Sequence, residues 1–177
     1  MALLKLVPPE NADGKLAQLY SITEEMFGAV PNNVRMLGVS PAVLENQLEF
    51  ARYFRAHPTL SVTFLAMVRL LVAASTDSPY CEKLNTGMLA QLGVPANQAE
   101  ALKGDPRSAP LSDKERALLT FVLRATKDPH GITAEDVQKL RELGWSDADI
   151  FDAVAHGARA MATNIIFDTF KLESDAF

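Results

Sequence analysis

The chain has 177 residues, of which 48% are hydrophobic and 22% are charged, as expected for a globular rather than a disordered or fibrous protein. Its net charge of −5 disfavours binding to nucleic acid or to anionic membranes, because both would repel it. The single cysteine excludes an internal disulfide, and the longest apolar stretch is too short to span a bilayer. We therefore expect a cytoplasmic protein without a nucleic-acid or membrane partner.

Helix start and stop signals recur along the chain, whereas the alternating pattern of strands is absent. Helices are predicted over Asp13–Phe27, Pro41 to about His57, Leu60–Ser75, Pro79 to about Leu92, Ala96–Lys103 and Asp113 to about Thr126. Thr133 and Ser146 open two more, and the second of these, the last helix, runs from Asp147 to about Leu172. The sequence thus predicts an all-α fold and a single domain over residues 1–177, with the loop at Lys103–Pro110 between two helical halves.

The Leu60–Ser75 segment is apolar on nearly every side, which is typical of a helix at the centre of a bundle or between subunits. Arg69 is the one charged residue within it. A lone guanidinium in such a helix must reach solvent, pair with a carboxylate or bind an anionic substrate. Of these three, we expect pairing with a carboxylate.

Cys81 is a first candidate for chemistry. Because Ser78 and Pro79 form a typical helix start, Cys81 is expected to be the third residue of a helix. The unpaired amides and the dipole at this place favour a thiolate, which makes a nucleophile. A lone cysteine is also often a small buried hydrophobe, and composition alone favours that interpretation.

His156 is a second candidate. Asp152, His156 and Arg159 are spaced at i, i+4 and i+7 on the last predicted helix, so they share one face. A carboxylate one turn before an imidazole can orient it for general acid–base catalysis, but an ordinary helical ion pair has the same spacing. The other two histidines, His57 and His130, lie in predicted turns, where we expect solvated side chains.

No nucleotide-binding, serine-hydrolase or zinc-protease motif is present, and we expect neither a metal nor a cofactor. The segment Thr133–Ala162 has the outline of a helix-turn-helix. Its second helix, however, opens with Asp147 and Asp149, followed by Asp152, and these carboxylates would repel DNA.

Three stretches carry a resemblance to a known family: VAASTDSPYC at Val72–Cys81, LAQLGV at Leu89–Val94, and the run from LSDKERALL to GITAEDVQKLRELGWSDADIFDAVAH. With them, nearly the whole chain resembles the carboxymuconolactone decarboxylase and alkylhydroperoxidase D-like superfamily, and its N-terminal half resembles the peroxidase-related subgroup. The resemblance implies an all-helical bundle that assembles as a homo-oligomer, a trimer or a hexamer, and acts on a small molecule.

The redox branch of that superfamily carries Cys-x-x-Cys, a His four residues later and a Glu about three turns earlier. Here the second cysteine matches Cys81, while Ser78, Asn85 and Ala66 stand at the other three positions. Since no second thiol exists to close a disulfide, the resemblance implies a one-cysteine peroxidase. In such an enzyme Cys81 forms a sulfenic acid, which an external thiol reduces.

Two alternatives remain open. The decarboxylase branch tends to carry a His on its late helix, near the place of His156, which implies a lyase or isomerase with Arg69 or Arg159 holding a small carboxylate or lactone. Ser78 and Asn85 would then line the substrate site. The other alternative is an oligomeric small-molecule-binding protein that has kept the bundle without the chemistry.

Overall fold

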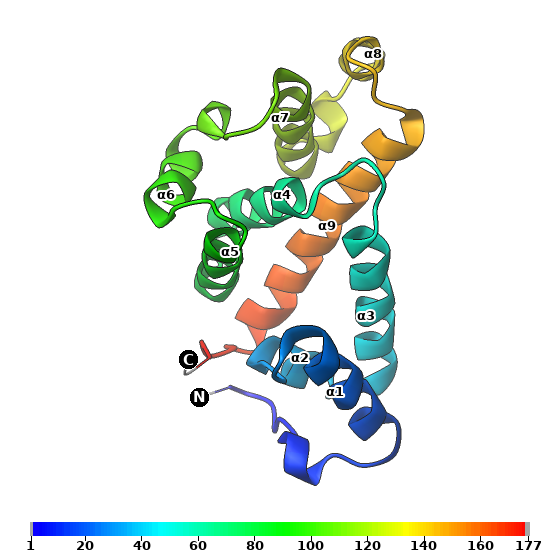
Figure 1. Ribbon diagram of the computed structural model, residues 1–177, viewed down its shortest axis with the longest axis vertical. Coiled ribbons are helices and arrows are strands. Elements are labelled where there is room, and N and C mark those ends of the chain that lie inside the picture. Colours follow the sequence, from blue (N-terminus) through cyan, green and yellow to red (C-terminus); the bar gives the residue numbers. More distant parts are fainter. Residues whose placement is uncertain (1, 176–177) are drawn as a thin grey trace. The chain divides into compact units, whose positions relative to one another are not determined.

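The computed structural model describes residues 2–175, which form nine α-helices and three short 3-10 helices and contain no strand (Figure 1). The prediction of an all-α fold is confirmed. The elements are η1 (Pro9–Asn11), α1 (Gly14–Phe27), α2 (Asn32–Leu37), α3 (Pro41–Arg55), α4 (Val62–Ser75), α5 (Pro79–Gln91), α6 (Ala96–Gly104), η2 (Pro106–Ser108), α7 (Asp113–Lys127), η3 (Pro129–Gly131), α8 (Ala134–Glu142) and α9 (Asp147–Thr169). None of the described helices is both long enough and apolar enough to cross a membrane.

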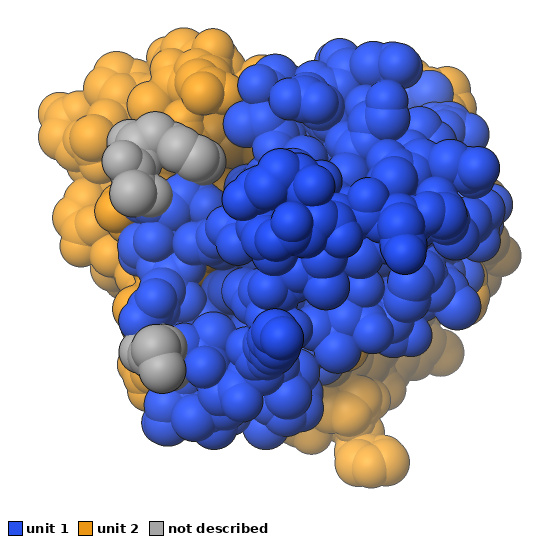
Figure 2. All heavy atoms as spheres, turned by 90° about the horizontal axis from the view of Figure 1, so that it is seen from below, with its two compact units in different colours: residues 1–56, 166–177 blue, residues 57–165 orange. Residues whose placement is uncertain are grey.

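The chain divides into two compact units, which Figure 2 distinguishes by colour. Unit 1 comprises residues 1–56 and 166–177, and unit 2 comprises residues 57–165. The division does not fall in the loop at residues 103–110, which lies inside unit 2 and contains η2.

Unit 1 is built on α1, α2 and α3. Leu44 and Leu48 of α3 are buried, whereas Val43, directly before Leu44, is 43% exposed. The N-terminal segment is held by its backbone, since the Leu3 amide donates to the Phe170 carbonyl at 2.9 Å. This hydrogen bond joins the N-terminal segment to the C-terminal segment within unit 1.

Unit 2 is organised around α4, which packs against α5, α6 and α7. Nine of the fourteen residues of α4 are buried, including Ala66 and Leu70 at 0% exposure. Of the two interpretations of this apolar segment, the structure supports the centre of a bundle over a subunit interface, because the chain itself buries these residues.

The helix starts in unit 2 follow the expected side-chain signals in part. Ser112 with Glu115 and Thr133 with Asp136 form reciprocal capping boxes at α7 and α8, because each pair satisfies two otherwise unpaired amides. Ser78 occupies the capping position of α5 and Pro79 its first residue, but the Ser78 side chain makes no capping hydrogen bond. Proline alone therefore marks the start of that helix.

Candidate active site

The turn between α4 and α5 places Cys81 in the first turn of α5. The turn is closed by a hydrogen bond of 3.0 Å from the Ser78 amide to the Ala73 carbonyl, and Asp77 takes a left-handed conformation with φ of 51°. Pro79 then begins α5, and Cys81 is its third residue. Cys81 is buried, with 5% of its surface exposed.

One face of α5 carries the residues that surround Cys81 in the fold. Cys81, Asn85 and Met88 are spaced at i, i+4 and i+7, so all three lie on that face. The Asn85 side chain donates from Nδ2 to the Cys81 carbonyl at 2.8 Å. Its amide orientation is thereby fixed, and Oδ1 is left to accept a hydrogen bond.

Arg69 of α4 joins this face to α9. Its Nε donates to Asn85 Oδ1 at 2.8 Å, its Nη1 to His156 Nε2 at 3.0 Å and its Nη2 to Met88 Sδ at 2.8 Å. All three acceptors are neutral. We call Arg69, Cys81, Asn85, Met88 and His156 the Arg69 cluster.

The prediction that Arg69 pairs with a carboxylate is wrong. Within residues 2–175 the guanidinium makes no ion pair, and its hydrogen bonds go to an amide, an imidazole and a thioether. Burial lowers the pKa of Arg69 to about 10, and a negative charge on Cys81 acts in the opposite direction. The group therefore remains protonated at neutral pH as a desolvated positive charge.

His156 is buried and neutral. Its pKa is lowered to about 3, chiefly by burial and also by the positive charge of Arg69, while a hydrogen bond with the backbone of Leu65 acts in the opposite direction. An imidazole that accepts from a guanidinium through Nε2 presents an unprotonated nitrogen to the cluster. His156 therefore holds Arg69 in place and cannot give a proton from Nε2.

Asp152, which the spacing on α9 pairs with His156, contacts a residue far away in the sequence. Its carboxylate instead lies 3.2 Å from Nε2 of His57, whose side chain is only 4% exposed, so the expectation of a solvated His57 is also wrong. Nδ1 of His57 accepts from the Leu60 amide at 3.0 Å, just before α4. We call this pair the His57 cluster. His130, by contrast, is exposed as predicted.

Gly157 explains how α9 brings His156 so close to α4. A Cβ at this position would lie 2.7 Å from Cγ1 of Val122 in α7 and 3.6 Å from Cγ1 of Val68 in α4. Real Cβ contacts are not that short, so only glycine allows this separation of the helices. The small residues of α9 therefore serve packing beside the cluster.

The structure thus brings together four of the six residues proposed from the sequence, namely Cys81, Asn85, Arg69 and His156. Ser78 is fully buried one turn before Cys81, and Arg159 follows His156 on α9 without being a hydrogen-bond partner of Arg69. Met88 was missed, although its spacing from Cys81 is a signal that the sequence contains. No group of three potential metal ligands occurs among the described residues.

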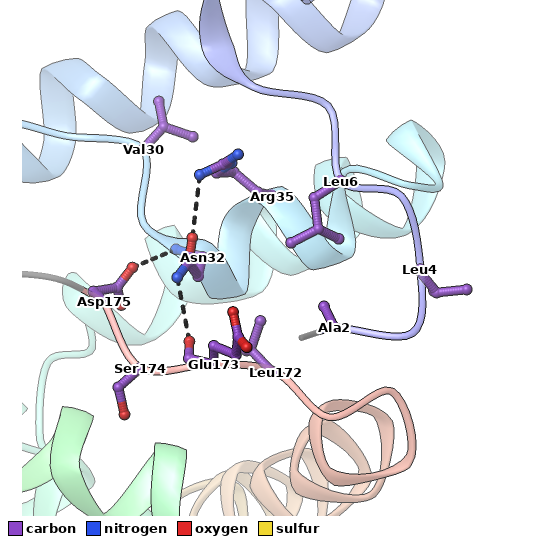
Figure 3. A pocket seen from close by; sticks show the side chains of 10 residues that line it. All are labelled: Ala2, Leu4, Leu6, Val30, Asn32, Arg35, Leu172, Glu173, Ser174 and Asp175. Carbon is purple, nitrogen blue, oxygen red and sulfur yellow. Dashed lines mark hydrogen bonds between the residues drawn. The ribbon is translucent and has the colours of Figure 1, made fainter.

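A separate cavity of about 550 Å³ lies within unit 1, between the N-terminal segment, α2 and the C-terminal segment (Figure 3). Asn32 lies on its wall, where its backbone amide donates to the Asp175 carboxylate at 2.7 Å and its side chain accepts from Arg35 at 3.2 Å. None of the predicted site residues lines this cavity.

No family model matches the sequence, and no curated protein is similar to it by sequence. Solved structures nevertheless share its fold. One is an uncharacterised peroxidase-related protein from Silicibacter sp. TM1040, with a TM-score of 0.85 and 23% identity over 99% of this chain and 92% of that one. Another is an alkylhydroperoxidase AhpD core protein from Ralstonia eutropha JMP134, with a TM-score of 0.87 and 19% identity over 99% and 93%.

A third structure with this fold is the debrominase Bmp8, solved as a variant with one cysteine replaced by alanine and in complex with 2,3,4-tribromopyrrole. Its TM-score is 0.79, with 17% identity over 99% of this chain and 93% of that one. The chain therefore has the alkylhydroperoxidase D-like fold, as the resemblance in its sequence implied.

Proposed function

We propose that this protein is a one-cysteine thiol oxidoreductase that reduces hydroperoxides, with the thiolate of Cys81 as the nucleophile. One observation carries the proposal: Arg69 is a desolvated positive charge whose hydrogen-bond acceptors are all neutral, and a negative charge on Cys81 stabilises it. Because such an interaction is reciprocal, Arg69 stabilises the thiolate of Cys81 over its thiol.

The reaction proceeds in two stages. The thiolate attacks the terminal oxygen of ROOH, the O–O bond breaks, and a sulfenic acid forms on Cys81 as RO⁻ leaves. An external thiol then displaces water to give a mixed disulfide, and a second external thiol releases Cys81. The external thiol is needed because the chain has no other cysteine. A supply of such thiols favours the cytoplasm as its place of action.

The remaining members of the Arg69 cluster are positioning residues in this proposal. Asn85 binds both the Cys81 carbonyl and Nε of Arg69, so it sets the guanidinium relative to the cysteine. His156 accepts from Arg69, and its lowered pKa keeps it neutral. A decarboxylase or isomerase mechanism with His156 as the acid fits less well, because that nitrogen carries no proton at neutral pH.

Reductive dehalogenation is a second candidate, favoured by the shared fold with a debrominase crystallised as a cysteine variant with a bromopyrrole. The Cys81 thiolate would take the halogen from carbon, a proton would replace it there, and an external thiol would convert the sulfenyl halide to a disulfide with release of halide. Both candidates use the same nucleophile and the same external reductant, and they differ in the electrophilic atom and in the proton that dehalogenation adds to carbon.

Turnover of hydroperoxide with dithiothreitol as reductant tests the proposal. We expect consumption of tert-butyl hydroperoxide by the wild-type protein, loss of that activity in Cys81→Ser, and capture of the oxidised wild-type protein by a sulfenic-acid reagent. A thiol that remains unmodified in the folded protein, with no turnover, would contradict the proposal and favour the binding protein. Turnover of bromopyrrole without turnover of hydroperoxide would favour the second candidate.

We also propose that the protein is a homo-oligomer, a trimer or a hexamer. The part of α9 in unit 2 exposes two large apolar side chains, Phe151 at 72% and Ile165 at 60%, which a subunit contact would remove from water. Sedimentation equilibrium of the wild-type protein and of Phe151→Glu tests this: we expect an oligomer and its dissociation, and a monomeric wild-type protein would contradict the proposal.

A further inference from the structure

The turn between α4 and α5 sets where Cys81 lies relative to Arg69. Arg69 is one helical turn before Ala73 in α4, and Cys81 is the third residue of α5. The Ser78 amide donates to the Ala73 carbonyl at 3.0 Å, and Pro79 begins α5 directly afterwards. A change in this turn would therefore change the separation between the guanidinium and the sulfur.

The turn has an unfavourable backbone conformation and little support from its own cap. Asp77 is left-handed, with φ of 51°, a conformation that glycine adopts more readily than a residue with a Cβ. Ser78 occupies the capping position of α5, but its side chain makes no capping hydrogen bond. Contacts from outside the turn therefore matter for how firmly it is held.

Asn164 of α9 supplies such a contact. It is 2% exposed, and its Nδ2 donates to Oγ1 of Thr76 at 2.9 Å. The Thr76 hydroxyl in turn donates to the carbonyls of Val72 at 3.1 Å and Ala73 at 3.2 Å. Because the Ala73 carbonyl also accepts from the Ser78 amide, a continuous series of hydrogen bonds runs from Asn164 to the start of α5.

The position of Asn164 requires a hydrogen-bond donor. The proton of the Thr76 hydroxyl is used on the carbonyls of α4, so toward α9 its oxygen can only accept. Asn164 also lies about two turns after His156, which accepts from Arg69 at 3.0 Å. One helix thus holds both the guanidinium, through His156, and the turn that leads to Cys81, through Asn164.

We infer that Asn164 is a positioning residue for Cys81, because it holds, through Thr76, the turn that places the thiol relative to Arg69. The inference rests on the proposed function and adds a residue to it. The attraction between a thiolate on Cys81 and the guanidinium weakens with distance, so a looser turn stabilises the thiolate less. Loss of the hydrogen bond from Asn164 should then raise the pH at which the thiolate forms.

The test is the pH dependence of iodoacetamide alkylation in Asn164→Leu and Thr76→Val, which each remove one partner and nearly keep the side-chain shape. We expect the pH of half-maximal rate to rise by roughly 0.5 unit or more in each variant. The double variant should shift it no further than the larger single effect, because both changes break the same bond. Thr76→Ser, which keeps the hydroxyl, should retain the wild-type value.

Thr163→Val is the matched control on α9. It removes a hydroxyl that donates to the Arg159 carbonyl at 2.8 Å within the same helix, and it should leave the pH of half-maximal rate unchanged. A lower free energy of unfolding in Asn164→Leu and Thr76→Val, with no change in that pH, would overturn the inference and leave the proposed function intact. A wild-type value at or above the pH of about 8.5 typical of free cysteine would overturn the proposed function itself.

Discussion

Two polar clusters lie one helical turn apart on α9, and their chemistry differs. In the His57 cluster a carboxylate, Asp152, faces Nε2 of His57, while the other nitrogen of the ring accepts from the Leu60 amide. In the Arg69 cluster a guanidinium is held by an amide, an imidazole and a thioether, none of them charged. The first cluster balances its polar groups within the chain, and the second leaves a positive charge without an opposite one.

Under the proposed function, the His57 cluster is structural and the Arg69 cluster is functional. A desolvated charge costs several kcal/mol unless a partner compensates it, so folding alone does not favour an arrangement like that of Arg69. In the proposed function the thiolate of Cys81 supplies the missing negative charge. The contrast is therefore open to test, because a change in the Arg69 cluster should alter reactivity and a change in the His57 cluster should alter stability.

The largest effect is expected from Arg69→Met, which removes the charge and keeps much of the side-chain volume. Without the guanidinium the thiolate of Cys81 is less favoured, so its alkylation at pH 7 should slow by about tenfold to a hundredfold. Stability in urea should change little, because the removal of an uncompensated charge is opposed by the loss of the donor to Asn85 Oδ1 and His156 Nε2. Arg107→Met, which removes an exposed guanidinium, should change neither quantity by much.

The pH dependence of stability is expected to report the burial of His156. Its pKa is lowered to about 3 in the folded protein, against 6.5 for an ordinary histidine, so the unfolded chain takes up a proton between these values and the folded chain does not. The contribution of His156 to the free energy of unfolding is then fully present above pH 6.5. It falls on acidification, by at most about 1.4 kcal/mol per pH unit.

Urea denaturation between pH 4.5 and 7 measures this slope. His156→Gln, whose amide oxygen can still accept from Arg69, should flatten it, whereas His130→Gln at an exposed position should leave it unchanged. A wild-type slope that persists in His156→Gln would mean that another group causes it and that the imidazole is not kept neutral by the fold.

Asp152→Ala probes the other side of the comparison. It leaves the buried N–H of His57 without its acceptor, which should lower the free energy of unfolding by about 1 to 3 kcal/mol. Asp147→Ala on the same helix breaks an exposed ion pair with Arg141, so its cost should stay below about 1 kcal/mol. Both variants should keep the wild-type alkylation rate of Cys81. A slower rate in Asp152→Ala alone would mean that the two clusters act as one site, and would contradict the contrast between them.

Gly157→Ala should have the smallest effect of the four. The added Cβ would lie 2.7 Å from Cγ1 of Val122, so α9 must shift, and we expect a loss of about 1 to 2 kcal/mol despite the better helix propensity of alanine. At Gly87 in α5 nothing lies within 4 Å of the new Cβ, and Gly87→Ala should instead stabilise the protein by roughly 0.5 to 1 kcal/mol. Thermal melts of both variants measure this difference in sign.

The helices could be predicted from the sequence because their signals are local. Proline after serine at α5, glycine at the end of α1 and the capping boxes of α7 and α8 all act within four residues. The resemblance of the Val72–Cys81 stretch to the alkylhydroperoxidase D-like proteins identified the fold, and solved structures with the same fold support this. These signals do not depend on how distant segments pack.

The partners of the polar residues could not be predicted in the same way, because they come from other helices. The spacing on α9 pairs Asp152 with His156, but the structure pairs Asp152 with His57, 95 residues away, and His156 with Arg69, 87 residues away. Periodicity shows which residues share a face and does not show what that face meets. The neutral surroundings of Arg69, which carry the proposed function, are a property of three helices together.

The most direct test of this account is the rate of alkylation of the native protein by iodoacetamide from pH 5 to 10. Cys81 is the only cysteine, so the signal has one source. Because Arg69 stabilises the thiolate, the rate should reach half its maximum well below the pH of about 8.5 that is typical of free cysteine, and Arg69→Met should move it back. A half-maximum at or above pH 8.5, or a thiol that reacts only after unfolding, would contradict the account.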